Sequence, residues 1–277
     1  MTPMVTAPEP APSALVELAC SVAAEAAELL MSGLGHASVV QTKSSPTDVV
    51  TEMDGAAEDL IRRQLQAARP GDSVLGEERG QTGEPSVVRW IVDPLDGTVN
   101  YLYGLPDWAV SIAAEVNGVV TAGAVCAPLR RTVFSATLGG GAWVQTAWQE
   151  GRQRLSCNTG IPLARALVAT GFSYSSEQRA HQGKVVAALL PRVRDIRRGG
   201  SAAIDMCSVA AGVVDCYYEQ GVHYWDIAAG GLIAREAGAV VGGLDGDDAS
   251  ETMTIAAAPG LFAELAAALA GLNAGGP

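Results

Sequence analysis

Two carboxylates leave an apolar segment together in the stretch WIVDPLDGTVNY at residues 90–101. Asp93 and Asp96 lie three residues apart, with Pro94 between them to stiffen the chain. Gly97 follows and lets the backbone approach a ligand closely. Carboxylates and a nearby backbone carbonyl are the oxygen ligands that suit Mg²⁺. The stretch therefore predicts a metal site, although taken alone it fits an ordinary Asp-Gly turn equally well.

Further carboxylates lie at the ends of two other apolar elements. Glu77 and Glu78 follow a short apolar strand, and Asp226 opens a predicted helix. Each has a simpler interpretation, because Asp226 could be a helix N-cap and the glutamates could belong to a solvated loop. Carboxylates at the ends of three apolar elements can nevertheless converge on one cation.

The elements that must position these residues fall into two parts. In the first part, apolar periodicity predicts a helix at 14–32 and a second helix that starts at Thr51, places Asp54 in its first turn and stops at Pro70. Alternation and turn residues then predict the strands of an antiparallel meander at 73–76, 87–92, 107–116, 119–127, 131–137 and 142–146. Asn117-Gly118 is a strong hairpin signal within it.

After about residue 155 short strands alternate with helices, which is typical of a layer that contains parallel strands. We expect strands at 166–170, 193–197, 213–218, 239–241 and 253–257, and helices at 176–190, 202–211, 226–237 and the Ala-rich C-terminal segment. The order predicts an α+β first part followed by a second, α/β layer that contains parallel strands. We expect a disordered tail at 1–12, an N-terminal subdomain at 13–155 and a C-terminal subdomain at 156–277.

Composition restricts the partners. The 277 residues carry a net charge of −12, with 30 acidic against 18 basic residues, so the average surface repels nucleic acid and anionic membranes. A phosphorylated substrate would meet the same repulsion unless bound cations reversed it locally. The five cysteines are widely spaced without a C-x-x-C pair, and no signal peptide or membrane span is evident. These features predict a cytoplasmic protein that binds neither membranes nor nucleic acid directly.

The chain resembles the inositol monophosphatase family, within the lithium-sensitive, magnesium-dependent phosphatases. The resemblance runs from residue 43 to about 242 and is carried, in order, by KSSPTDVVTEMD, GEE, WIVDPLDGTVNY, GGSAA and YYEQGVHYWDIAAGG. It implies the inositol monophosphatase fold, a layered α+β and α/β sandwich with the metal site between its halves. The resemblance further implies a homodimer and two or three Mg²⁺ ions per site. It also implies hydrolysis of a small phosphorylated polyol or metabolite, first of all inositol monophosphate, by direct attack of a metal-bound water.

The resemblance assigns the metal ligands by position. Glu77, Asp93 and the Leu95 carbonyl resemble the ligands of a first ion, and Asp93, Asp96 and Asp226 those of a second. A third, weaker ion relies on Glu77 and waters.

Further roles follow from the same resemblance. Asp54 and Thr98 match the pair that orients the attacking water. Lys43 and Asp48 match residues that surround the metal ligands without binding the metal themselves. Glu78 matches no direct ligand. The residues expected to contact substrate are Asp96, Gly97, Thr98, Gly200, Ser201, Ala202, Glu219 and Asp226.

The substrate contacts also have simpler interpretations. Backbone amides at Gly97, Thr98 and 200–202 would hold phosphate oxygens, but Ser201 could equally be an ordinary helix N-cap. Glu219 would accept a substrate hydroxyl, or else be a surface residue. Of the histidines, His36 and His181 are expected at the surface, whereas His223 lies near enough to Asp226 in sequence to line the pocket.

Alternative functions stay open at this point. The same chemistry could act on histidinol phosphate, fructose bisphosphate or phosphoadenosine phosphate, and the segment at 171–179 does not discriminate among them. A regulatory or binding protein of the transcription machinery is the alternative of another class, because some bacterial members of the family have that role. A calcium-binding module at 245–248 lacks the full ligand spacing and the distal glutamate.

Overall fold

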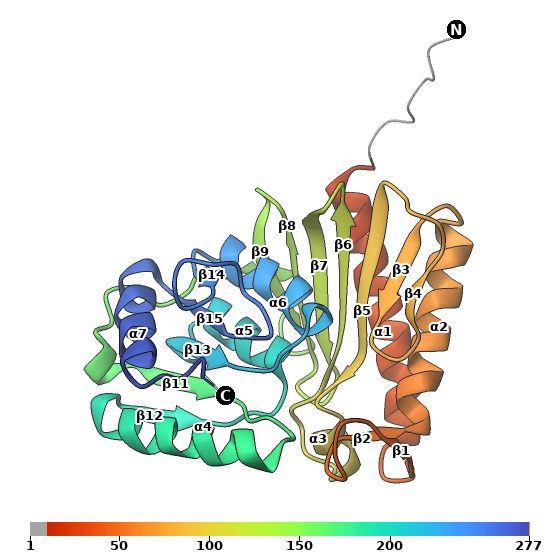
Figure 1. The fold of residues 1–277 in the computed structure, drawn as a ribbon. Coiled ribbons are helices and arrows are strands. Elements are labelled where there is room, and N and C mark those ends of the chain that lie inside the picture. The colour runs from red at the N-terminus through yellow and green to blue at the C-terminus, as the bar shows by residue number, and fades with distance from the viewer. Residues whose placement is uncertain (1–9, 277) are drawn as a thin grey trace, which may run out of the picture.

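A computed structural model describes residues 10–276 and arranges them in alternating layers of helices and sheets (Figure 1). A helical pair covers one face of a large sheet, a second pair separates that sheet from a smaller one, and a third pair covers the far side of the smaller sheet. This arrangement confirms the predicted layered α+β and α/β sandwich. Most of the tail predicted at 1–12 lies outside the described residues, and the first helix already begins at Pro12.

The large sheet contains eight strands in the order β10-β9-β8-β7-β6-β5-β3-β4. They are β3 (Ser73–Gly76), β4 (Gly80–Thr82), β5 (Val88–Asp96), β6 (Ala109–Val116), β7 (Val119–Ala127), β8 (Thr132–Thr137), β9 (Gly141–Thr146) and β10 (Arg152–Arg154). Neighbours from β5 to β10 pair antiparallel, as the sequence predicts. The prediction is wrong for the strand at 73–76: β3 pairs parallel with β5, because β4, which lies between them in the chain, pairs on the outer side of β3. Asn117 and Gly118 have φ of 51° and 84°, which confirms a hairpin turn between β6 and β7.

An irregularity in β5 explains how Asp93 and Asp96 reach the same place. Residues three apart on a regular strand point to opposite faces of the sheet. Here Asp93 pairs with Ser111 and Asp96 pairs with Ala109, so three steps along β5 match two steps along β6. The extra residue reverses the alternation. The bulge therefore brings both carboxylates to one side of the sheet.

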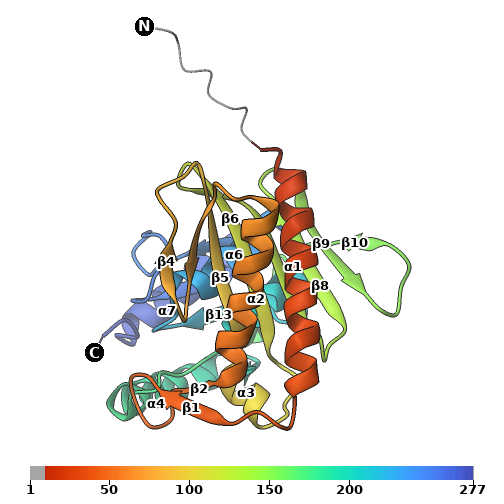
Figure 2. The same ribbon diagram turned by 90° about the vertical axis from the view of Figure 1, so that its right-hand side faces the viewer.

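Helices α1 (Pro12–Gly33) and α2 (Glu52–Ala68) pack on one face of the large sheet (Figure 2). The small-residue stripe of α1, including Ala19, Ala23 and Ala26, is fully buried and lets the helix approach β6 and β7 closely. Between these two helices the chain forms a hairpin of β1 (Val39–Thr42) and β2 (Val49–Thr51). Thr51 and Asp54 form the predicted capping box at the start of α2.

The smaller sheet has the strand order β12-β11-β13-β15-β14. Its strands are β11 (Leu167–Thr170), β12 (Asp195–Arg197), β13 (Cys216–Glu219), β14 (Val240–Gly242) and β15 (Thr254–Ala257). β11 pairs parallel with both β12 and β13, which confirms a second layer containing parallel strands. The remaining helices are the short α3 (Thr98–Leu102), then α4 (Ser176–Leu189), α5 (Ala202–Ala210), α6 (Tyr224–Glu236) and α7 (Pro259–Gly271).

Four clusters of buried apolar side chains fill the four spaces between the layers. Helices α5 and α6 contribute to the clusters on both of their sides, so they join the two sheets. The boundary between subdomains at residue 155 stays a prediction, although the large sheet ends before it and the smaller sheet begins after it. In residues 10–276, no helix combines the length and the apolar character that a membrane span requires.

Candidate active site

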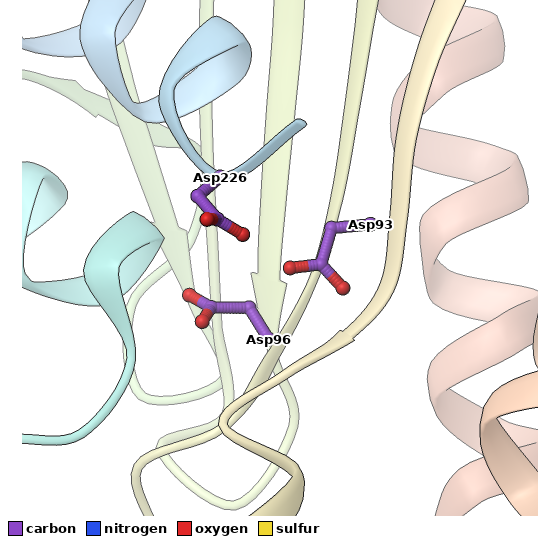
Figure 3. Close-up of side chains that lie close together, drawn as sticks. All are labelled: Asp93, Asp96 and Asp226. Carbon is purple, nitrogen blue, oxygen red and sulfur yellow. The ribbon is translucent and has the colours of Figure 1, made fainter. Parts of the chain in front are cut away.

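Three aspartates from two distant parts of the chain converge between the large sheet and α6 (Figure 3). Asp93 and Asp96 come from the bulged end of β5, and Asp226 comes from the first turn of α6. One carboxylate oxygen from each residue lies within 4.8 Å of the others. Among the described residues this is the one group of three or more potential side-chain ligands that lie this close together. The separation suits oxygens that share a cation.

Each aspartate is anchored through one of its oxygens. The Leu95 amide donates to Asp93 Oδ1 at 2.9 Å, and the His223 amide donates to Asp226 Oδ2 at 2.6 Å. Asp96 Oδ2 accepts the Ser201 hydroxyl at 2.5 Å and the Ala203 amide at 2.8 Å. The second oxygen of each carboxylate is thereby left available to a ligand.

The position of Asp226 corrects the simpler interpretation of that residue. The N-cap of α6 is His223, and Asp226 is the third residue of the helix, where its carboxylate accepts the His223 amide. The N-cap interpretation is therefore wrong, because the helix starts two residues before the predicted start. A carboxylate at this third position still stabilises the helix start, since it satisfies a free backbone N–H.

Electrostatic repulsion within the cluster makes it a strong site for positive charge. Burial raises the pKa of Asp93 well above its usual value, and the carboxylates of Glu77, Asp96 and Asp226 raise it further. Burial likewise raises the pKa of Asp226, with Asp96 and Glu77 as the next causes. A divalent cation would relieve this repulsion and favour the ionised forms. The donor set, all hard oxygen, fits Mg²⁺.

Helix α5 starts against Asp96. Burial raises the pKa of Asp96, while hydrogen bonds from the Ser201 hydroxyl and from the amides of Ala203 and Ala202 lower it. Ser201 is also the N-cap of α5, because its side chain accepts from the Ile204 amide at 3.2 Å. The N-cap interpretation of Ser201 is thus confirmed. Binding of substrate by the amides of 200–202 stays a prediction, and Gly200 and Ala202 do line the cavity described below.

Glu77 borders the three aspartates and is held by a cation. Lys43 Nζ lies 2.8 Å from Glu77 Oε1 and 2.6 Å from Glu78 Oε1. The two carboxylates raise the pKa of Lys43 by more than its burial lowers it. The lysine therefore stays charged and positions Glu77 beside the cluster, whereas Glu78 lies outside the cavity lining.

Sequence reasoning missed Glu58, which builds the turn that carries Glu77. Glu58 is fully buried in α2 and accepts the amides of Glu78 at 2.7 Å and of Arg79 at 3.0 Å. A Cβ at Gly76 would lie 2.5 Å from Glu58 Oε1, so only glycine leaves room for this carboxylate. The sequence gives only a weak signal for this role. Glu58 is followed by Arg62 one helical turn later, and many exposed helices have an acidic and a basic residue at this spacing.

Thr98 and Asp54 meet as the resemblance implies. The Thr98 hydroxyl lies 3.0 Å from Asp54 Oδ1 and 3.1 Å from the Leu95 carbonyl oxygen. Burial raises the pKa of Asp54 to about 6, against the opposing hydrogen bonds from Thr51 and Thr98. A carboxylate with this pKa can accept a proton near neutral pH.

Glu77, Thr98 and the three aspartates line one cavity of about 430 Å³, which is large enough for a small phosphate ester. Glu219 lines it from the end of β13 and is half-buried, so it is no ordinary surface residue. His223 also lines it and lies 2.8 Å, through Nδ1, from Glu251 Oε1. His36 is exposed, as predicted, and His181 is half-buried with Nε2 2.9 Å from the Asn273 carbonyl oxygen.

The remaining acidic segment lies elsewhere. Asp245, Asp247 and Asp248 border a separate depression beside the C-terminal residues Asn273 and Gly275. They form no close group of three carboxylates among the described residues. The structure therefore adds nothing to the calcium-binding alternative.

The layered fold and a cavity lined by the carboxylates of Glu77, Asp93, Asp96 and Asp226 define the class of protein, an α/β protein with a site that suits a hard cation. The model of the inositol monophosphatase family matches residues 11–273. The chain is 46% identical to "Inositol-1-monophosphatase SuhB" of Mycobacterium tuberculosis, over 97% of this chain and 98% of the relative. The solved structure "Mycobacterium tuberculosis SuhB" matches with a TM-score of 0.81 and 45% identity, covering 95% of this chain and 98% of that one.

The chain belongs to the inositol monophosphatase family and is a phosphoric monoester hydrolase. Relatives in this family carry more than one kind of name. A protein of Xylella fastidiosa, 41% identical over 75% of this chain and 73% of its own length, is called "Nus factor SuhB".

Proposed function

We propose that the protein is a Mg²⁺-dependent phosphomonoesterase that hydrolyses a small phosphorylated polyol, with inositol monophosphate as the first candidate. The observation that carries the proposal is the convergence of Asp93, Asp96 and Asp226 in a cavity that also contains Glu77 and Thr98. Membership of the inositol monophosphatase family and a relative named inositol-1-monophosphatase support the substrate class.

The carboxylates would hold two or three Mg²⁺ ions. Glu77, Asp93 and the Leu95 carbonyl would serve one ion, and Asp93, Asp96 and Asp226 a second. When bound, Mg²⁺ supplies a nucleophilic water at neutral pH and stabilises negative charge on the phosphate and leaving oxygens.

The chain's own groups orient the reactants. Thr98 Oγ1 donates to Asp54 Oδ1, which leaves its lone pairs free to accept a hydrogen bond from the water that would attack phosphorus. This water would pass a proton to Thr98 Oγ1 while the Thr98 hydroxyl proton passes to Asp54 Oδ1, a carboxylate with a pKa of about 6. Backbone amides at Gly97, Thr98 and 200–202 would bind the equatorial phosphate oxygens. No covalent phosphoenzyme is needed for this route.

Identity of the substrate can be tested with a panel of esters at fixed Mg²⁺. We expect the highest kcat/KM for inositol monophosphate, ahead of histidinol phosphate, fructose bisphosphate and phosphoadenosine phosphate. A preference of tenfold or more for any of the other three would reassign the substrate without changing the chemistry. No phosphate release from any of the four would contradict the proposed activity.

We further propose a cytoplasmic homodimer that binds neither membranes nor nucleic acid directly, on the strength of the family resemblance and the net charge of −12. The name of the Xylella relative supports a second candidate function within the transcription machinery. Binding of the Asp226→Asn variant to purified transcription elongation complexes would test it. If the variant binds with the affinity of the wild-type protein, the result would favour a role in transcription that is separate from catalysis. If neither the variant nor the wild-type protein binds, the result would count against such a role.

A further inference from the structure

Glu219 is held by a residue of its own strand. Tyr217 and Glu219 are two positions apart on β13, so their side chains point to the same face of the smaller sheet. The Tyr217 hydroxyl donates to Glu219 Oε2 at 2.9 Å, and the tyrosine is fully buried between the sheet and helices α5 and α6. The hydroxyl therefore cannot exchange this partner for bulk water.

The neighbouring strand leaves the space in which the carboxylate lies. Thr170 pairs with Tyr218 in the parallel β11–β13 ladder, so the next residue, Gly171, falls beside Glu219. A Cβ at Gly171 would lie 2.0 Å from Glu219 Oε1 and 2.2 Å from Oε2. Any side chain at position 171 would have to displace the carboxylate from its place on the cavity wall.

These contacts leave one oxygen of Glu219 free to accept a hydrogen bond from a molecule in the cavity. Among the described residues, the Tyr217 hydroxyl is the one hydrogen-bond donor to this carboxylate. Burial raises the pKa of Glu219 to about 7, and the Tyr217 hydrogen bond opposes that rise by favouring the ionised form. Tyr217 therefore orients the Glu219 carboxylate and also favours its ionised form, which accepts hydrogen bonds.

We propose that Tyr217 and Gly171 are positioning residues that aim Glu219 at the leaving group, so that the enzyme selects phosphate esters whose leaving group carries a hydrogen-bond donor such as a hydroxyl or an ammonium. The inference rests on the proposed phosphatase function. It assigns the two residues an effect on substrate selection, whereas the carboxylate cluster carries the hydrolysis.

Tyr218 provides a matched control. It follows Tyr217 directly and is equally a buried tyrosine, but it faces the cluster between the smaller sheet and α4 and α7. Its hydroxyl forms no hydrogen bond with Glu219. Tyr218→Phe removes the same atom from the same strand on the opposite face.

The test compares myo-inositol 1-phosphate with 4-nitrophenyl phosphate, whose leaving group offers no donor. For Tyr217→Phe, the kcat/KM ratio of the first ester to the second should fall roughly three- to tenfold, mainly through KM. This factor corresponds to about 0.6–1.4 kcal/mol, the net value of one hydrogen bond. Gly171→Ala should lower the ratio at least as much, and Tyr218→Phe should leave it within about twofold. Adding Tyr217→Phe to Glu219→Ala should lower the ratio no further, because both changes act through one group.

The outcomes separate the two proposals. An unchanged ratio for Tyr217→Phe, or the same loss with both esters, would overturn the positioning role, whatever Gly171→Ala does. Additive losses in the double variant would overturn it as well. If the wild-type protein released phosphate from neither ester in Mg²⁺, the proposed function itself would fail.

Discussion

Replacement of Asp226 by asparagine separates a ligand role from a purely structural one. The change keeps a side-chain oxygen that can accept the His223 amide, now 2.6 Å from Asp226 Oδ2, so the start of α6 should survive. It removes one negative charge from a group whose oxygens lie within 4.8 Å of one another. At this separation two like unit charges repel each other by about 3.5 kcal/mol in an effective dielectric near 20.

Only part of that energy is released in the protein without metal, because the raised pKa values of Asp93 and Asp226 show that the cluster is readily protonated. We expect a gain of roughly 1 kcal/mol for Asp226→Asn under chelator, which corresponds to a melting temperature about 2–4 °C higher. With saturating Mg²⁺ the wild-type protein should have the higher melting temperature, since ions that bind its folded state stabilise it.

Turnover of an inositol phosphate should fall by at least about two to three orders of magnitude, because an anionic ligand beside the leaving group is lost. The assay is phosphate release at saturating Mg²⁺, combined with thermal unfolding with and without the metal. Glu177→Gln is the control, since Glu177 is an exposed acidic residue in the first turn of α4. Near-normal turnover of Asp226→Asn, or a lower melting temperature under chelator, would refute the reasoning.

Three further predictions concern stability and ions. Gly97 has a φ of 93°, and a Cβ there would lie 2.8 Å from the Asp107 carbonyl oxygen. Gly97→Ala should therefore lower the free energy of unfolding, measured in urea, by more than about 2 kcal/mol. Gly104 has a φ of 69° with open space around it, so Gly104→Ala should cost only the backbone strain of about 1–2 kcal/mol. Burial raises the pKa of Asp205 to about 8, so the folded state keeps a proton that the unfolded state loses above about pH 4, and stability falls as pH rises from 4 to 8. The free energy of unfolding of Asp205→Asn, relative to that of the wild type, should therefore rise by roughly 1–3 kcal/mol between pH 5 and pH 8. A difference between the two proteins that stays constant with pH in urea unfolding would contradict this. Ca²⁺ should support little phosphate release in place of Mg²⁺, and Li⁺ should inhibit; equal rates with Ca²⁺ would show that the site does not require octahedral geometry.

The sequence was sufficient to predict the fold class and the longer helices and strands, but not the short elements β1, β2, β4, β10 and α3 or the parallel pairing of β3 with β5. Regular alternation in the meander and the Asn117-Gly118 turn predicted strands that the structure contains within a few residues. The family motifs also pointed to Asp93, Asp96 and Asp226, which the structure brings together. These features depend on local patterns or on segments long enough to be specific.

Features that depend on contacts between distant segments could not be predicted. The bulge between Asp93 and Asp96 requires the pairing with β6, and nothing in the β5 sequence itself fixes that register. The buried Glu58 contacts the turn after β3, twenty residues away in the chain, and its spacing to Arg62 resembles an exposed helical pair. The start of α6 at Tyr224 was missed because His223 is an uncommon N-cap, and Asp226 is the type of residue that usually fills that position.

Phosphate release from myo-inositol 1-phosphate, measured while Mg²⁺ is titrated into chelator-treated wild-type protein, tests the central claim most directly. We expect no release above background under chelator, followed by a saturable rise as Mg²⁺ is added, because the carboxylates of Asp93, Asp96 and Asp226 need a cation to act together. Full activity in excess chelator, or no activity at any Mg²⁺ concentration, would contradict the account.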